Sequence, residues 1–162
     1  MSVTLSSMVF ILQAIFAGAL VPLQAGSNAE LGRTLGHPLW ATLVSLLVSL
    51  LIIIPIIVAL RITLPALNDV KLLPAWAWFG GIFGVIYITS ALLLLPRLGA
   101  SNFMIGVIAG QLLISLLMDH YGWLNVPVKP INIGRMAGVV LVLLGVVTMQ
   151  WFTSKPALLV TS

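Results

Sequence analysis

Cysteine and charge are what this sequence has least of. Its 162 residues include no cysteine, three acidic residues and two histidines. Without cysteine the chain can form neither a disulfide nor a thiolate metal site. Charged residues make up 6% of the chain, whereas an average soluble domain carries about 25%. So little charge cannot cover the surface of a soluble protein, and the composition therefore excludes an ordinary soluble domain.

Long apolar stretches fill the chain instead. Hydrophobic residues make up 61% of it, and a helix needs about 20 apolar residues to cross the hydrocarbon core of a bilayer. Five stretches of this kind predict transmembrane helices at residues 3–25, 39–60, 75–95, 98–118 and 136–154. The sequence therefore predicts an all-α, multi-pass membrane protein with a single five-helix domain over residues 1–162.

The first stretch is expected to stay as a helix. It lacks a basic segment and a small-residue cleavage site, so it does not have the pattern of a signal peptide. It either ends near residue 25 or continues past Pro22 and Gly26 as a broken or tilted helix, because polar residues follow immediately. At the other loops, only Pro96 and Arg97 separate the third and fourth stretches.

The basic residues are spread over both ends of these spans. An odd number of spans places the two chain ends on opposite sides of the membrane. One side then collects Arg61, Lys71, Lys129 and Arg135, and the other collects Arg33, Arg97 and Lys155. An excess of Lys and Arg on one side normally sets orientation, so this near balance favours insertion in both orientations. Alternatively, Arg61 and Arg135 set one orientation from positions close to their helix ends. Basic residues scattered singly favour headgroup anchoring over nucleic-acid binding.

Glycine and alanine recur at small-x-x-x-small spacing in four of the five spans, a spacing that lets membrane helices approach closely. The pairs are Ala14 and Gly18, Gly80 and Gly84, Gly106 and Gly110, and Gly134 and Gly138. They predict a tightly packed bundle.

Polar residues inside the spans are the candidate binding residues. At about 100° per residue, Gln13, Gln24 and Asn28 fall on one face of the first helix, and Gln111 with Ser115 makes a second stripe on the fourth. Amides both donate and accept hydrogen bonds, so a cavity lined by them can hold a polar solute. Alternatively, these amides link helices to one another.

Two carboxylates are candidates for a coupling or a structural role. A carboxylate near a cavity can exchange a proton for a cation, but Glu30 lies three residues before Arg33, which predicts a surface ion pair. Asp119 ends the fourth span, where the helix dipole disfavours negative charge. His120, Lys129 and Arg135 are its available partners, so it is expected to tie the long loop that follows.

The chain has no cluster of histidines and acids with metal spacing and no phosphate-cradling glycine loop; its imidazoles are His37 and His120. We therefore expect no catalytic residues, no metal site and no cofactor, and the chain is not predicted to be an enzyme.

Several short motifs, in order along most of the chain, resemble the YdcZ-like family, a five-helix branch of the drug/metabolite transporter superfamily. They are Gln24, Asn28, Leu31 and Gly32; residues 38–41, PLWA; 78–84, WFGGIFG; 96–100, PRLGA; Gly110 and Gln111; 119–122, DHYG; and Arg135 and Gly138.

The resemblance implies a half-size transporter in the bacterial inner membrane. Larger members of the superfamily hold two inverted five-helix repeats, with helices one to four of each half lining a central cavity. A five-helix chain would supply that architecture by pairing, as an antiparallel homodimer or with a paralogue. Four-helix relatives use a membrane-buried Glu in helix one, and this chain has no carboxylate at that depth.

Alternating-access transport of a small polar or amphipathic solute is thus the predicted function, with membrane lipid, the solute and a second chain as partners. Two alternatives stay open at this stage. A membrane scaffold or accessory subunit would need no water-filled cavity. A lipid-handling protein would have a lateral opening and a bound lipid.

Overall fold

The computed structural model describes residues 5–66 and 70–153. Three residues used above lie outside this part of the chain: Val3 at the start of the first predicted span, Ser154 at the end of the last span, and Lys155. Within the described residues every regular element is a helix and there is no strand. The all-α prediction is therefore confirmed.

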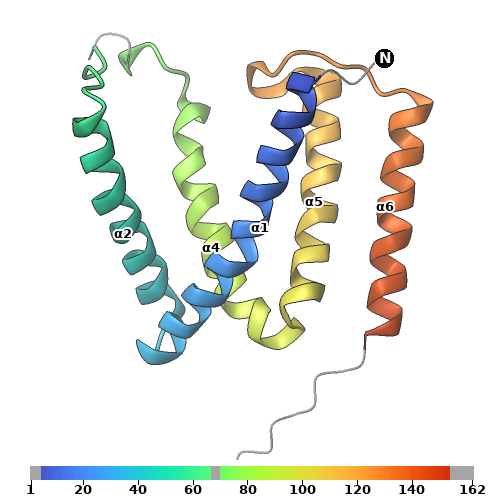
Figure 1. Cartoon of the computed structure of the whole chain (residues 1–162), viewed down its shortest axis with the longest axis horizontal. Coiled ribbons are helices and arrows are strands. Elements are labelled where there is room, and N and C mark those ends of the chain that lie inside the picture. Colours follow the sequence, from blue (N-terminus) through green and yellow to red (C-terminus); the bar gives the residue numbers. More distant parts are fainter. Residues whose placement is uncertain (1–4, 67–69, 154–162) are drawn as a thin grey trace, which may run out of the picture. The chain divides into compact units, whose positions relative to one another are not determined.

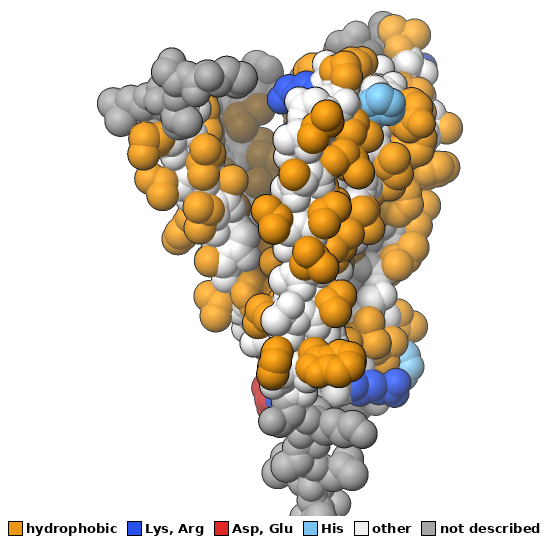
Figure 2. Space-filling view, turned by 90° about the vertical axis from the view of Figure 1, so that its right-hand side faces the viewer, with side chains coloured by type: hydrophobic (Ala, Val, Ile, Leu, Met, Phe, Trp, Pro, Cys, Tyr) orange, Lys and Arg blue, Asp and Glu red, His pale blue; other side chains and the backbone are white. Residues whose placement is uncertain are grey.

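Five helices are long and apolar enough to cross a membrane. In chain order the elements are α1 (Leu5–Thr34), α2 (Pro38–Ala59), the short 3-10 helix η1 (Ala75–Trp78), α4 (Phe79–Leu98), α5 (Ala100–Tyr121), the 3-10 helix η2 (Trp123–Asn125) and α6 (Ile133–Phe152) (Figure 1). All five predicted spans are present. Hydrophobic side chains cover the visible lengths of the helices, and the basic and acidic side chains on that face lie towards the helix ends (Figure 2).

Three boundaries differ from the predicted ones, each for a local reason. The first helix runs unbroken to Thr34, because Pro22 costs one backbone hydrogen bond without ending the helix. The turn after α4 falls at Gly99 and not at Pro96 and Arg97, since a sharp reversal needs a left-handed residue and Gly99 has φ 78°. The last helix begins at Ile133 because the Asn132 side chain caps it, accepting a hydrogen bond from the Arg135 amide at 2.9 Å.

α1 is longer than a bilayer requires. Its 30 residues extend over about 45 Å, whereas the hydrocarbon core is about 30 Å thick. A helix of this length must tilt or leave a turn or more outside the hydrocarbon. The last two turns, which carry Asn28, Glu30 and Arg33, therefore lie close to one membrane surface. A short turn follows, in which the His37 ring nitrogen accepts from the Leu39 amide and Pro38 begins α2.

Contacts along the chain divide it into two compact units, residues 1–95 and 96–162. In the first unit α1 packs against α2, and a small core joins α1, α2 and α4. In the second unit α5 packs against α6 and η2. The single-domain organisation stays a prediction.

The core of the first unit is built from small residues. Ala29 of α1, Ala41 of α2 and Leu92 of α4 are buried together, with Ile88 and Leu95 packed against them. Gly32 makes this approach possible, because a Cβ atom there would lie 3.3 Å from Leu92 Cδ2 and 3.8 Å from Ala41 Cβ. The α1 backbone thus comes close to both neighbouring helices at this residue, as small residues allow in membranes.

The predicted small-x-x-x-small pairs are not the residues that make this contact. A Cβ added at Gly18, Gly84, Gly110 or Gly138 would meet no atom within 4 Å. At most 11% of the residues in the most apolar window of each span are buried inside the chain. The described residues of each unit therefore do not form the tightly packed bundle that this spacing predicts. In the first unit the close helix contact is made by Gly32 with Ala41 and Leu92.

Candidate functional site

Asn28 is one of two polar residues that the fold buries in the first unit; the other is Thr42. Its side chain is 6% exposed. It lies on the α1 face that also carries Ala25, Ala29 and Gly32, the face turned towards α2 and α4. No hydrogen bond of its amide to another described residue is found, so Asn28 forms no helix cross-link within the described part of the chain. A buried amide with free donors and an acceptor can hold a polar solute or water.

Two threonines and a tyrosine add polar groups to the same unit. The Thr42 hydroxyl lies 3.0 Å from the Thr89 hydroxyl and donates to the Pro38 carbonyl oxygen at 3.2 Å, so it links α2 to α4. The Tyr87 hydroxyl on α4 is buried and has no partner among the described residues. α1 and α4 run in the same direction (Figure 1) and meet where Gly32 contacts Leu92. Asn28 lies four residues before Gly32, and Tyr87 lies five residues before Leu92. The two polar side chains therefore start at nearly the same height along their helices.

Sequence reasoning missed Tyr87. It is one of two tyrosines in the chain and the one inside a span. A buried phenol needs a polar partner for its hydroxyl, and that was the available signal.

The other two amides of the α1 stripe are exposed. Gln24, one turn before Asn28, and Gln13, nearer the start of the helix, both have exposed side chains. The predicted stripe on α1 therefore has one buried member and two members that the rest of the first unit leaves exposed. An amide in contact with hydrocarbon loses its hydrogen bonds to water, at a cost of several kcal/mol. These glutamines must face water or another protein surface.

Gln111 and Ser115 belong to the second unit. Gln111 lies in the middle of α5 and is exposed. The Ser115 hydroxyl donates to the Leu112 carbonyl oxygen at 3.0 Å, and Ser115 lines a groove between α5 and α6. Ser115 is therefore already partly satisfied within its own helix, whereas no partner of the Gln111 amide is found in the described part of the chain.

Both carboxylate candidates are paired. Glu30 forms an ion pair with Arg33 on the same helix, as the spacing predicts, and both side chains are about two-thirds exposed. A pair so exposed contributes little to stability. Glu30 is thus a surface residue at the end of α1, outside the buried face that carries Asn28.

Asp119 forms an ion pair with Arg135, which selects one of its three available partners. Arg135 also donates to the Lys129 carbonyl oxygen at 2.7 Å, and the Lys129 amide donates to the Asp119 carbonyl oxygen at 2.7 Å. His120 accepts from the Ile131 amide at 3.2 Å. These bonds tie the loop between α5 and α6 to both helix ends, which is the structural role predicted for Asp119.

The same end of the second unit contains a tight turn at Gly122. Gly122 ends α5 in the left-handed region at φ 65°, a conformation that glycine adopts without the steric cost that a Cβ adds. A Cβ there would also lie 2.8 Å from Val128 Cγ2. Tyr121 and Trp123 stack beside the turn with ring centroids 5.7 Å apart, as expected of aromatic residues at the headgroup level.

The comparison with protein families decides the identity of the chain. A family model described as "Putative inner membrane exporter, YdcZ" matches residues 9–148, from α1 into α6. The chain belongs to this YdcZ family. Neither the comparison with curated proteins nor the comparison with solved structures returned a match.

Membership of the YdcZ family and the five apolar helices establish a multi-pass inner-membrane transporter. In the described ranges, 5–66 and 70–153, no group of three or more His, Asp or Glu side chains could hold a metal ion. Among the amides of the predicted binding residues, Asn28 is the one that is buried, and it has no hydrogen-bond partner in the described part of the chain.

Proposed function

We propose that this YdcZ-family protein moves a small polar or amphipathic solute by alternating access, and that it works as an antiparallel dimer. The observation that carries the proposal is Asn28, an amide that is buried between transmembrane helices and has no hydrogen-bond partner in the described part of the chain. The Asn28 nitrogen and oxygen are not among the side-chain atoms that are sealed from the surface without a partner. A solute or a water-filled path can therefore meet the amide.

Gln24 and Gln111 extend the proposed path. Gln24 lies one turn from Asn28 on α1, and Gln111 lies at mid-height of α5. Both are exposed, so both can meet a solute without rearrangement of their own helix. Gln13 and Ser115 stay predicted members of the same path.

Pairing of two chains follows from the same exposed amides. Inverted repeats place a binding site at the interface between two halves of a transporter, and one chain with five spans offers one half. A second chain in the opposite orientation, identical or paralogous, would cover Gln13, Gln24 and Gln111 and leave them facing a shared polar cavity. The description of the family supports export as the direction of transport.

Single cysteines test the proposed path directly. The natural sequence contains no cysteine, so each variant carries one thiol and needs no prior engineering. In membrane vesicles we expect Gln24→Cys, Asn28→Cys and Gln111→Cys to react with a membrane-impermeant maleimide, because water reaches a transport path. Alternating access predicts that each thiol reacts from either side of the membrane, since the path opens to both sides in turn.

Matched controls lie beside these positions. Leu23 and Leu113 are exposed apolar residues next to Gln24 and close to Gln111, and their cysteine variants should stay unlabelled if they face lipid. Protection of positions 24, 28 and 111 alike would contradict the transport path and favour the scaffold. If these three positions react with a lipid-soluble maleimide but not with the impermeant one, the result would favour a lipid-handling protein with a lateral opening.

Asn28 can also be tested without knowing the solute. Asn28→Leu removes an unpaired amide and keeps a similar volume, so the thermal midpoint of unfolding in detergent should stay within about 2 °C of the natural protein or rise. The control Thr42→Val breaks the link to Thr89 and should cost about 1 kcal/mol, or about 2–4 °C. If Asn28→Leu lowers the midpoint more than Thr42→Val does, Asn28 is a structural residue.

A further inference from the structure

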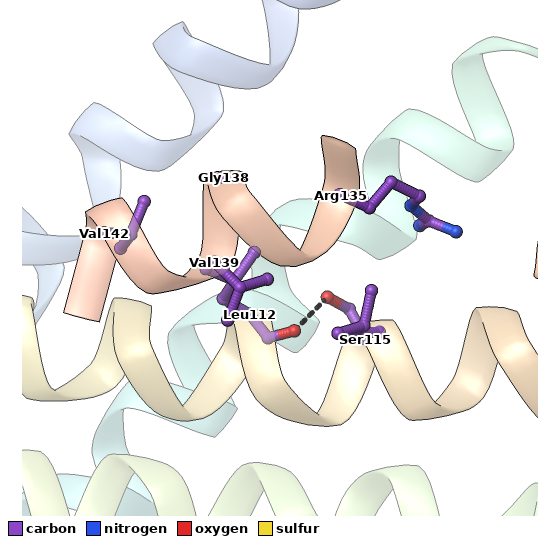
Figure 3. Close-up of a pocket in the computed structure, with 7 residues that line it drawn as sticks. Leu112, Ser115, Arg135, Gly138, Val139 and Val142 are labelled. Carbon is purple, nitrogen blue, oxygen red and sulfur yellow. Dashed lines mark hydrogen bonds between the residues drawn. The ribbon is translucent and has the colours of Figure 1, made fainter. Parts of the chain in front are cut away.

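A groove runs between α5 and α6 in the second unit. Its volume is about 300 Å³, and its walls include Leu112, Ser115 and Leu116 of α5 with Arg135, Gly138 and Val142 of α6. In Figure 3 the Arg135 side chain lies at one end of this set and Val142 at the other, with Leu112 and Val139 between the two helices. The groove is thus charged at one end and apolar along the rest.

Gly138 keeps the apolar part open. A Cβ atom built there would meet nothing within 4 Å, so any larger side chain would project into free space beside Val142 and Leu112. The Ser115 hydroxyl is bonded to the Leu112 carbonyl oxygen and leaves no strong demand for a polar ligand at this depth. A flexible hydrocarbon chain is the occupant that such a surface suits.

The charged end offers donors for an anion. A guanidinium has five N–H donors, and the hydrogen bonds of Arg135 to Asp119 and to the Lys129 carbonyl oxygen use one at each terminal nitrogen. The Lys129 backbone takes part in the loop network, but no partner of its ammonium group is found in the described residues. Lys129 does not line the groove, but its carbonyl oxygen accepts from Arg135, so its side chain starts beside the charged end. Together the two cations outweigh Asp119 at this end of the second unit.

The level of this end in the membrane matches a lipid headgroup. The stacked Tyr121 and Trp123 rings lie at the same end of the second unit, and such rings prefer the headgroup layer. Cations at that level beside an apolar groove between helices complement an anionic headgroup and its acyl chain.

From this charge complementarity we infer that the groove binds one anionic phospholipid per chain. The phosphate contacts Arg135 and the Lys129 ammonium group, and one acyl chain lies along Gly138 towards Val142. The bound lipid would cover the second unit's exposed groove and hold the end of α6 against α5. Apart from Ser115, which is also a predicted member of the transport path, the groove shares no residue with the path proposed around Asn28.

Native mass spectrometry of the full chain in neutral detergent tests the inference, with dioleoylphosphatidylglycerol and dioleoylphosphatidylcholine as the two probes. We expect one phosphatidylglycerol per chain, bound several-fold more tightly than phosphatidylcholine. Lys129→Gln should weaken phosphatidylglycerol binding about fivefold, the value of one cation at a membrane surface, because it removes the ammonium group and leaves the Lys129 backbone bonds in place. Gly138→Leu should weaken both lipids by filling the groove.

Each variant has a matched control. Arg97→Gln removes one exposed cation from the last turn of α4, and Gly145→Leu makes the same change two turns further along α6, beyond the groove residues. Both should bind phosphatidylglycerol as the natural protein does. Equal affinity for the two lipids, or equal losses in Lys129→Gln and Arg97→Gln, would overturn the inference. If Gly138→Leu does not fold, the comparison of Lys129→Gln with Arg97→Gln still tests whether the groove binds an anionic lipid.

Discussion

A reporter fused after residue 162 is expected on both sides of the inner membrane in comparable amounts. The physical reason is that four basic residues on one side oppose three on the other, and the bias that normally sets orientation is nearly absent. Paired alkaline phosphatase and fluorescent-protein fusions measure the two populations. Dual insertion would supply the oppositely oriented copies that an antiparallel homodimer requires.

Charge variants make this prediction sharper. Arg33→Gln with Arg97→Gln leaves one cation against four, so the reporter should shift to a single side and the homodimer should be lost. A second variant has the opposite charge bias. It combines Arg61→Gln, Lys71→Gln and Ser101→Lys, which leaves two cations on the side of Lys129 and Arg135 and four on the side of Arg33 and Arg97. Neither variant should dimerise alone, and co-expression of the two should restore the dimer.

A one-sided reporter in the natural protein would contradict the antiparallel homodimer. The search would then turn to an oppositely oriented paralogue, or to the scaffold function. Cysteine accessibility separates these two outcomes, because a paralogue pair retains a water-filled path past Asn28 and a scaffold does not.

Gly32→Leu is expected to lower the thermal midpoint of unfolding in detergent by about 3–10 °C. A Cβ at position 32 already lies 3.3 Å from Leu92 Cδ2, so a full leucine side chain forces α1 away from α2 and α4. Overpacking of this kind costs about 1–3 kcal/mol, and each kcal/mol corresponds to about 2–4 °C in a chain of this size. Because Ala29 and Ala41 share the contact, the Asn28 environment should open as well.

Gly18→Leu is the matched control on the same helix. A Cβ there meets no atom within 4 Å. The free energy of unfolding should therefore change by less than about 1 kcal/mol, and the thermal midpoint by less than roughly 2 °C. The maleimide reactivity of Asn28→Cys, combined with each leucine substitution, adds a second readout. Labelling should increase in the double variant with Gly32→Leu and stay unchanged in the double variant with Gly18→Leu. Equal midpoints for the two leucine variants would show that the close contact at Gly32 does not hold the first unit together.

The number and the places of the spans follow from the sequence by itself. A helix in a bilayer satisfies its own backbone hydrogen bonds, so a run of about 20 apolar residues is sufficient to specify it. The family motifs are likewise local in the chain, and the match over residues 9–148 confirms what they indicate. The ion pair of Glu30 with Arg33 was predictable for the same reason, because its partners are three residues apart on one helix.

Packing and burial were decided by the tertiary structure. Glycine spacing alone indicated four other pairs as helix contacts, but Gly32 makes the close approach because Leu92 and Ala41 meet it from distant parts of the chain. Asn28 and Gln24 fall on the same predicted stripe, yet only Asn28 is buried. Asp119 had three available partners, and the loop path selected Arg135. Each of these outcomes depends on side chains far apart in sequence, which periodicity along one helix cannot specify.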